Sequence, residues 1–228
     1  MAYLLLLGLV ASIGLIALLS PKITNPASRN SFIVGLVLIS IGFLEQLVLG
    51  FALDENAARL FYWSRQMLAL AWIGHGFLLF LLPNQSKTRW FTYGLIAASF
   101  LSLALVGGTQ ITKAESWFRP TIPIYAQITD LLATNRPTRW LAWLLNLYGG
   151  LSLIGGAIFL ISKGKTKLLY FAPILAAAAL LQPILLSPQE SNYSFYVIEL
   201  TVLVAIYWIL AGDPANFRSR QRTARKKK

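Results

Sequence analysis

The fold is decided by the stretch FIVGLVLISIGFLEQLVLGFAL (residues 32–53), DENA (54–57) and ARLFYWSRQMLALAWIGHGFLLFLL (58–82). Each of the two apolar segments is as long as the ~20 residues that a helix needs to cross the hydrocarbon core of a bilayer. The residues between them leave room only for a tight turn, so the two helices must be antiparallel neighbours. This stretch therefore predicts a hairpin of two membrane-spanning helices.

Further apolar runs of similar length follow the same pattern along the chain of 228 residues. Only 12% of the residues are charged, whereas a soluble domain carries about 25%. No segment is both long and polar enough to form a second, water-soluble domain. The sequence predicts an all-α fold: an integral membrane seven-helix bundle over 1–212, followed by a basic tail over 213–228. The seven expected spans are 3–19, 32–53, 58–82, 90–107, 140–162, 167–186 and 193–211.

Charged residues outside the runs are distributed unevenly between the two sides of this bundle. The side that holds the connections 20–31, 83–89 and 163–167 and the C-terminal tail carries 14 basic residues and one acid, Asp213. The opposite side carries five basic residues and five acids. Cytoplasmic loops hold the excess of Lys and Arg. The N-terminus is therefore expected outside and the C-terminus in the cytoplasm, in a multi-pass protein of the plasma membrane, most simply a bacterial inner membrane.

The net charge of +12 alone would also fit a nucleic-acid-binding protein, but the position of the charges argues against this class. Much of the charge lies in the tail 218–228, directly after the last apolar run, and no aromatic residues alternate with it as they do in single-strand binders. Contact with the anionic inner leaflet of the bilayer is the first expectation, and docking to an acidic partner is the second.

The long connection 108–139 is expected on the outer side. Its apolar residues recur at helical spacing between prolines and predict a short amphipathic helix lying in the interface. These residues are Ile124, Tyr125, Ile128, Leu131 and Leu132.

Small residues within the runs predict places where helices pack closely, because close backbone approach drives helix association in lipid. One set is Gly149, Gly150, Ser152, Gly155 and Gly156 in the fifth run. Another set is Gly94, Ala97 and Ala98 in the fourth run.

Two ionisable residues within the hairpin lie at matching depth. Glu45 is ~12 Å and Arg65 ~10 Å below the outer surface at 1.5 Å per residue. Because the two helices are neighbours, these side chains are the expected ion pair.

Further polar side chains fall in the same outer third of the bundle, namely Gln66, Asn146, Gln182 and Glu199. Two interpretations stand. In one, these groups hold helices together or reach the interface. In the other, they line a cavity open to the outside that binds a small polar or amphipathic ligand, since ionisable residues inside a membrane usually mark function.

His75 is the only histidine, within the sequence WIGHG at 72–76, and the chain contains no cysteine. The flanking glycines leave room for a bulky group, so His75 is a candidate ligand for a pigment or for a haem shared with another subunit. The alternative is a histidine that donates to a backbone carbonyl of a neighbouring helix. No metal site and no hydrolytic constellation is apparent, and a non-enzymatic protein is expected.

Residues 42–82 resemble the second and third helices of the seven-helix sensor module found at the N-terminus of some bacterial histidine kinases and diguanylate cyclases. The resemblance lies in GFLEQL at 42–47, the acidic turn at 54–55, ARLFYWSRQML at 58–68 and FLLF at 77–80. It implies a receptor-like bundle in a bacterial plasma membrane. Since no kinase or cyclase domain follows the seventh run, such a sensor would act through a separate partner.

The function expected is therefore that of a sensor-like bundle that binds a small ligand from the outer side and acts through another membrane protein. The alternative is an accessory or structural subunit of a larger respiratory, photosynthetic or transport complex.

Overall fold

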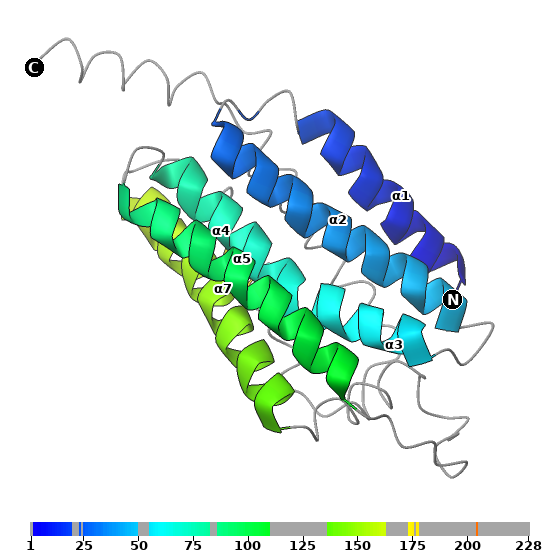
Figure 1. Ribbon diagram of the computed structural model, residues 1–228. Coiled ribbons are helices and arrows are strands. Elements are labelled where there is room, and N and C mark those ends of the chain that lie inside the picture. Colours follow the sequence, from blue (N-terminus) through cyan, green and yellow to red (C-terminus); the bar gives the residue numbers. More distant parts are fainter. Residues whose placement is uncertain are drawn as a thin grey trace, which may run out of the picture.

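Every element of the described chain is a helix (Figure 1). The computed structural model describes residues 2–19, 23, 25–49, 55–82, 86–109, 136–162, 173–175, 177 and 204. The helices are α1 (Ala2–Leu19), α2 (Pro26–Leu49), α3 (Glu55–Phe61), the π-helix η1 (Tyr62–Ala69), α4 (Leu70–Leu81), α5 (Ser86–Gly108) and α7 (Arg136–Ser162). The all-α fold class is confirmed for this part of the chain.

Three described segments are long and apolar enough to cross a membrane, namely Pro26–Glu45, Thr88–Gly108 and Pro137–Ser162, and Leu6–Leu18 is a shorter apolar helix. The chain thus has the helices of a membrane protein. Most residues of the expected spans 167–186 and 193–211, the interfacial helix within 108–139 and the tail 213–228 lie outside the described residues.

Helix α2 begins six residues before the apolar run that predicted it, because polar side chains anchor its first turns. Asn25 caps the helix by accepting a hydrogen bond from the Ala27 N–H (3.2 Å), and its amide donates to the Leu79 carbonyl of α4 (3.0 Å). Ser28 donates to the carbonyl of Gly76, also on α4 (2.8 Å). The predicted span left these residues out because they are polar. In the structure their side chains bond to backbone groups and not to water, so the helix can include them.

The expected third span is one continuous helix in three parts, with the π-helical segment in its interior. In an α-helix, Trp63 and Trp72 would lie on opposite faces, because nine steps of ~100° make two and a half turns. The i→i+5 turns of a π-helix rotate less per residue. As a result, both indoles reach α5: Trp63 Nε1 donates to Ser102 Oγ (3.0 Å) and Trp72 Nε1 to Ser99 Oγ (3.1 Å).

Helix α4 is the centre of the described bundle. It packs mainly against α2 and α7, and α1 packs on the far side of α2 (Figure 1). All residues of α4 from Leu70 to Phe77 are buried. Two glycines permit the close approach of α4 and α7. A Cβ at Gly74 would collide with the backbone of Gly149, and a Cβ at Gly149 would collide with the carbonyl of Leu70.

The predicted packing seams are confirmed on α7 for Gly149 and Gly156, which face the backbone and side chains of α4. Gly155 and Gly94 differ, since a Cβ at either position meets nothing within 4 Å in the described structure. Helix α7 therefore packs on α4 through Gly149 and Gly156, whereas Gly155 lies on an exposed part of the helix surface.

A matched pair of substitutions on α7 tests this seam. We expect Gly149→Ala to lower the free energy of unfolding by about 1–3 kcal/mol, because the new methyl group must push the α4 backbone away. Gly155→Ala should be as stable as the wild type or slightly more stable, since alanine favours the helix and has open space there. Thermal unfolding of the purified protein in detergent measures both. Equal stability of the two variants would contradict the close contact between α4 and α7.

Candidate functional site

Arg65 lies at the centre of the π-helical segment and is only 8% exposed. Its guanidinium carbon Cζ is 4.9 Å from the ring centroid of Phe43 on α2 and 5.3 Å from that of Phe61. Both distances are within the range of cation–π attraction. A Cβ at Gly42 would lie 2.9 Å from the Arg65 side chain, so the glycine makes room for its stem. The hairpin thus builds a niche of two aromatic rings and a glycine around one cation.

Glu45 is on the same helix as Gly42 and follows it by three residues, which is about one helical turn. Its side chain is partly exposed. The contact between Arg65 and Gly42 therefore places the two ionisable residues of the hairpin within about one turn of each other along the bundle. The ion pair between Glu45 and Arg65 stays a prediction.

Asn146 joins the π-helical segment to α7. Its side chain is buried, and its amide nitrogen donates to the Gln66 carbonyl (2.6 Å) and to the Ala142 carbonyl of its own helix (2.8 Å). Gln66 itself is half-buried. The structure therefore brings Arg65, Gln66 and Asn146 to one level of the bundle. Gln182 and Glu199, which the sequence assigns to the same layer, lie outside the described residues.

His75 forms a second polar cluster, where α4, α5 and α7 meet. The ring is fully buried, with Nδ1 2.7 Å from the Tyr148 hydroxyl and Nε2 2.8 Å from Thr92 Oγ1. The Thr92 hydroxyl donates its single proton to the Thr88 carbonyl (3.0 Å). It must then accept from Nε2–H, which leaves Nδ1 to accept from the Tyr148 hydroxyl. These contacts assign the neutral Nε2–H tautomer.

The hydrogen bonds of His75 decide how it could take a cofactor. Both ring nitrogens already have partners, so a haem iron or a pigment metal would first have to displace Tyr148 or Thr92. The expected alternative, in which His75 donates to a backbone carbonyl of a neighbouring helix, is wrong, because the ring nitrogens bond to the side-chain hydroxyls of Tyr148 and Thr92. Among the described residues, no group of three or more His, Asp or Glu side chains could hold a metal ion.

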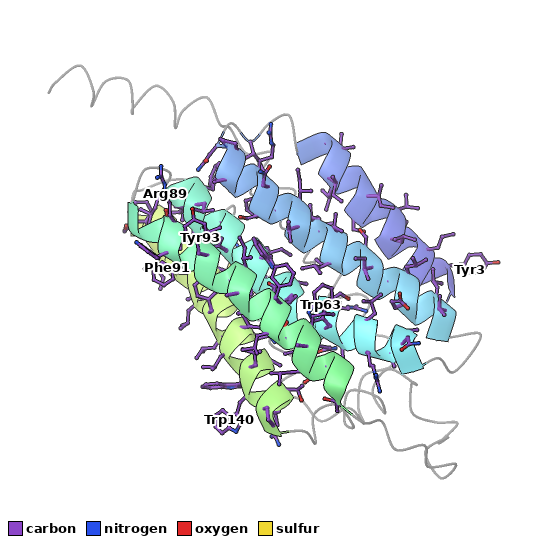
Figure 2. All side chains as sticks on the ribbon, in the orientation of Figure 1. Tyr3, Trp63, Arg89, Phe91, Tyr93 and Trp140 are labelled. Carbon is purple, nitrogen blue, oxygen red and sulfur yellow. The ribbon has the colours of Figure 1, made fainter. Side chains whose placement is uncertain are left out.

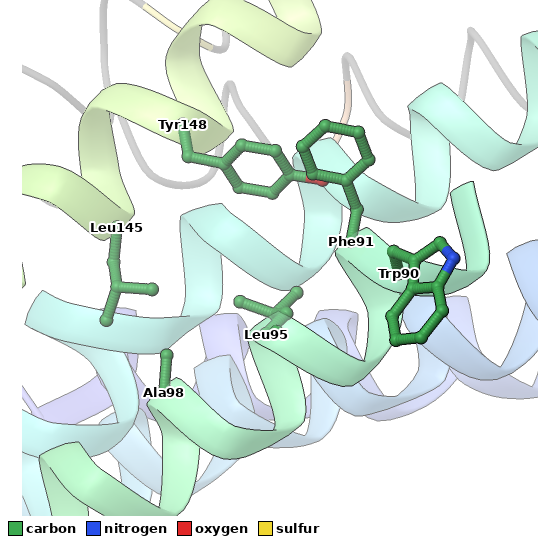
Figure 3. Close-up of a pocket in the computed structure, with 7 residues that line it drawn as sticks. Trp90, Phe91, Leu95, Ala98, Leu145 and Tyr148 are labelled. Carbon is green, nitrogen blue, oxygen red and sulfur yellow. The ribbon is translucent and has the colours of Figure 1, made fainter. Parts of the chain in front are cut away.

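An open apolar pocket of about 340 Å³ lies beside this cluster, between α5 and α7 (Figure 3). It is lined by Trp90, Phe91, Gly94, Leu95, Ala98, Leu145 and Tyr148. The Phe91 ring stacks on the Tyr148 ring, with centroids 6.2 Å apart and planes 14° apart. Tyr148 thus lines the pocket with its ring while its hydroxyl bonds to His75.

Sequence reasoning missed this pocket because it searched for polar residues, and the pocket is apolar. A signal was nevertheless present. Gly94 and Ala98 are four residues apart and therefore share one helix face, with Trp90 one turn before them. On such a face, small residues leave a hollow next to large rings.

No protein-family model, no curated protein and no solved structure matches this chain. The resemblance of residues 42–82 to a sensor module stays a prediction.

Removing the Tyr148 hydroxyl tests the His75 cluster. We expect Tyr148→Phe to lower the free energy of unfolding by about 1–2 kcal/mol, because it leaves Nδ1 buried without its donor. Thr92→Val should have a similar effect, and the double variant should be less harmful than the sum of the two, since both bonds position one ring. Tyr93→Phe is the matched control, since Tyr93 directly follows Thr92 on α5 and its side chain is exposed. If Tyr148→Phe were as mild as Tyr93→Phe, the assigned hydrogen bond would be wrong.

Proposed function

We propose that this protein is a non-enzymatic, receptor-like membrane protein that binds a small polar or amphipathic ligand around Arg65 from the outer side and acts through a partner protein. The observation that supports this proposal is the placement of Arg65 within a π-helical segment in the interior of an apolar bundle. Ionisable residues inside a membrane are expensive to maintain and usually serve function. π-helical segments are also frequent at functional sites.

The surroundings of Arg65 fit a ligand-binding role. Arginine presents a planar fork of donors that suits carboxylates and phosphates, and aromatic faces fix the plane of the guanidinium group. Phe43 and Phe61 supply such faces. Asn146 adds a polar side chain from α7 at the same level. A non-enzymatic role is in keeping with the single histidine, since both of its ring nitrogens are already engaged in hydrogen bonds.

The proposed orientation has seven spans, with the N-terminus outside and the C-terminus in the cytoplasm. The charge distribution of the connections supports it. Under this orientation, Arg65 lies nearer the outer surface, and the start of α5 and the end of α7 lie at the cytoplasmic surface.

Cysteine labelling tests the orientation without background, because the chain contains no cysteine. We expect Arg139→Cys, at the exposed start of α7, to react with a membrane-impermeant maleimide on intact cells. Asn30→Cys, exposed in the first turns of α2, should react only after permeabilisation. The reverse labelling pattern, or equal labelling of both positions, would rule out the proposed topology.

A second function, that of an accessory subunit, is favoured by the exposure of α5. Only 17% of its apolar span is buried, against 50% in each of the spans of α2 and α7. Ala97 and Ala104 are exposed on its surface. Small residues exposed in this way suit close packing against a helix of another protein.

Ligand-dependent stabilisation tests the receptor proposal. The purified protein is heated with a panel of small carboxylates, phosphates and amphipathic acids. We expect at least one compound to raise the melting temperature, since a ligand at 100 times its Kd stabilises by about 2.7 kcal/mol. Arg65→Gln should abolish the shift. Arg59→Gln, six residues earlier on the same continuous helix, should retain it.

The outcome that opposes the receptor proposal is also defined. If no compound stabilises the wild type, or if Arg65→Gln keeps the shift, Arg65 is not the binding residue. Stoichiometric co-purification of other membrane proteins in mild detergent, identified by mass spectrometry, would then favour the accessory subunit.

A further inference from the structure

The pocket between α5 and α7 lies between antiparallel helices. Phe91 stacks on Tyr148, while Leu95 and Ala98, further along α5, line the pocket together with Leu145, which is earlier on α7. The start of α5 and the end of α7 are therefore at the same end of the bundle, as Figure 1 also shows. Trp90 and Phe91, near the start of α5, place the pocket towards this end.

The interior of the pocket is apolar, but an exposed cation lies next to it. Arg89 is exposed and directly precedes Trp90 (Figure 2). After Ser162, the last residue of α7, the chain continues with Lys163, Lys165 and Lys167. No acid lies within 83–89 or 163–167 to neutralise these cations. An occupant that matches both features has an apolar chain and an anionic head.

Aromatic residues mark the level at which the head of such an occupant would lie. Trp90 is 77% exposed, and its ring meets that of Tyr93 edge to face at 6.3 Å. Trp and Tyr collect at the boundary between hydrocarbon and headgroups. This pair therefore places the mouth of the pocket at the membrane interface, with Arg89 at headgroup level and the pocket within the hydrocarbon.

We propose that this pocket binds an anionic phospholipid of the cytoplasmic leaflet, with one acyl chain along Gly94 and Ala98 and the phosphate beside Arg89. Basic sites between membrane helices on the cytoplasmic side are suited to anionic headgroups. The glycine is what makes the hollow, since nothing lies within 4 Å of the position where its Cβ would be. The binding site is independent of the ligand proposed at Arg65, and only the choice of leaflet depends on the proposed orientation.

A helix of another protein is a poorer occupant of this pocket. Helices that pack on small residues need their backbones to approach closely. The rings of Trp90 and Phe91, which are 77% and 54% exposed, stand at the edge of the hollow and hold a second backbone away. A flexible acyl chain can pass between these rings.

Native mass spectrometry of the full-length protein tests the proposal. The protein, purified in mild detergent, is incubated with equal amounts of dioleoyl phosphatidylglycerol and dioleoyl phosphatidylcholine, and bound lipids are counted. We expect the wild type to retain phosphatidylglycerol preferentially. Arg89→Gln should reduce this preference about fivefold, since one basic residue near a membrane surface contributes about that factor. Gly94→Leu should reduce the retention of both lipids, because its side chain fills the hollow.

Two controls separate this pocket from general attraction to lipid. Arg139→Gln removes an exposed arginine at the opposite end of α7, and Gly14→Leu fills open space on α1, where a Cβ also meets nothing within 4 Å. Both should bind lipid as the wild type does. If Arg89→Gln and Gly94→Leu behave like these controls, the pocket does not bind the lipid. If only Gly94→Leu has an effect, the occupant is apolar and the anionic headgroup is excluded.

Discussion

The close approach of α4 to α7 is the contact on which the rest of the described bundle depends. Two glycines, Gly74 and Gly149, let the backbones meet where any side chain would collide. In a bilayer this kind of packing replaces the hydrophobic effect as the force between helices. Because α4 is fixed against α7, its other face meets α2, and His75 comes within hydrogen-bonding distance of Tyr148. The pocket next to Tyr148 depends on the same contact.

The π-helical segment sets the direction of the side chains before α4. It carries Trp63 to the same helix that Trp72 reaches, so both indoles donate hydrogen bonds to one turn of α5, at Ser99 and Ser102. It also presents the Gln66 carbonyl to Asn146. With α-helical geometry throughout, one of the two tryptophans would face away from α5. The segment is thus held in place by partners on two different helices, which explains how a less common helix form persists in the interior of a bundle.

The positions of the described spans could be predicted from the sequence, because an apolar run of about twenty residues has the length that a helix needs to cross a bilayer. The start of α2 could not be predicted, because Asn25 and Ser28 are polar residues. Their hydrogen bonds to the α4 carbonyls are seen only in the folded structure. Hydropathy and depth could place Arg65 and Asn146 at one level of the bundle. They could not predict the π-helical segment that carries Arg65 and presents the Gln66 carbonyl to Asn146. That segment has no pattern of its own in the residue types.

Arg65 and His75 show two different ways in which this bundle accommodates a polar side chain, and the difference bears on function. His75 is surrounded by partners that satisfy each ring nitrogen once, so its cluster is complete and joins three helices. Arg65 meets two aromatic faces, which attract the charge of the guanidinium group but do not accept its hydrogen bonds. The aromatic faces fix the plane of the guanidinium group, which the proposed recognition of a carboxylate or a phosphate requires. The proposed function thus assigns structural cohesion to His75 and ligand recognition to Arg65, although both residues lie in the same continuous helix.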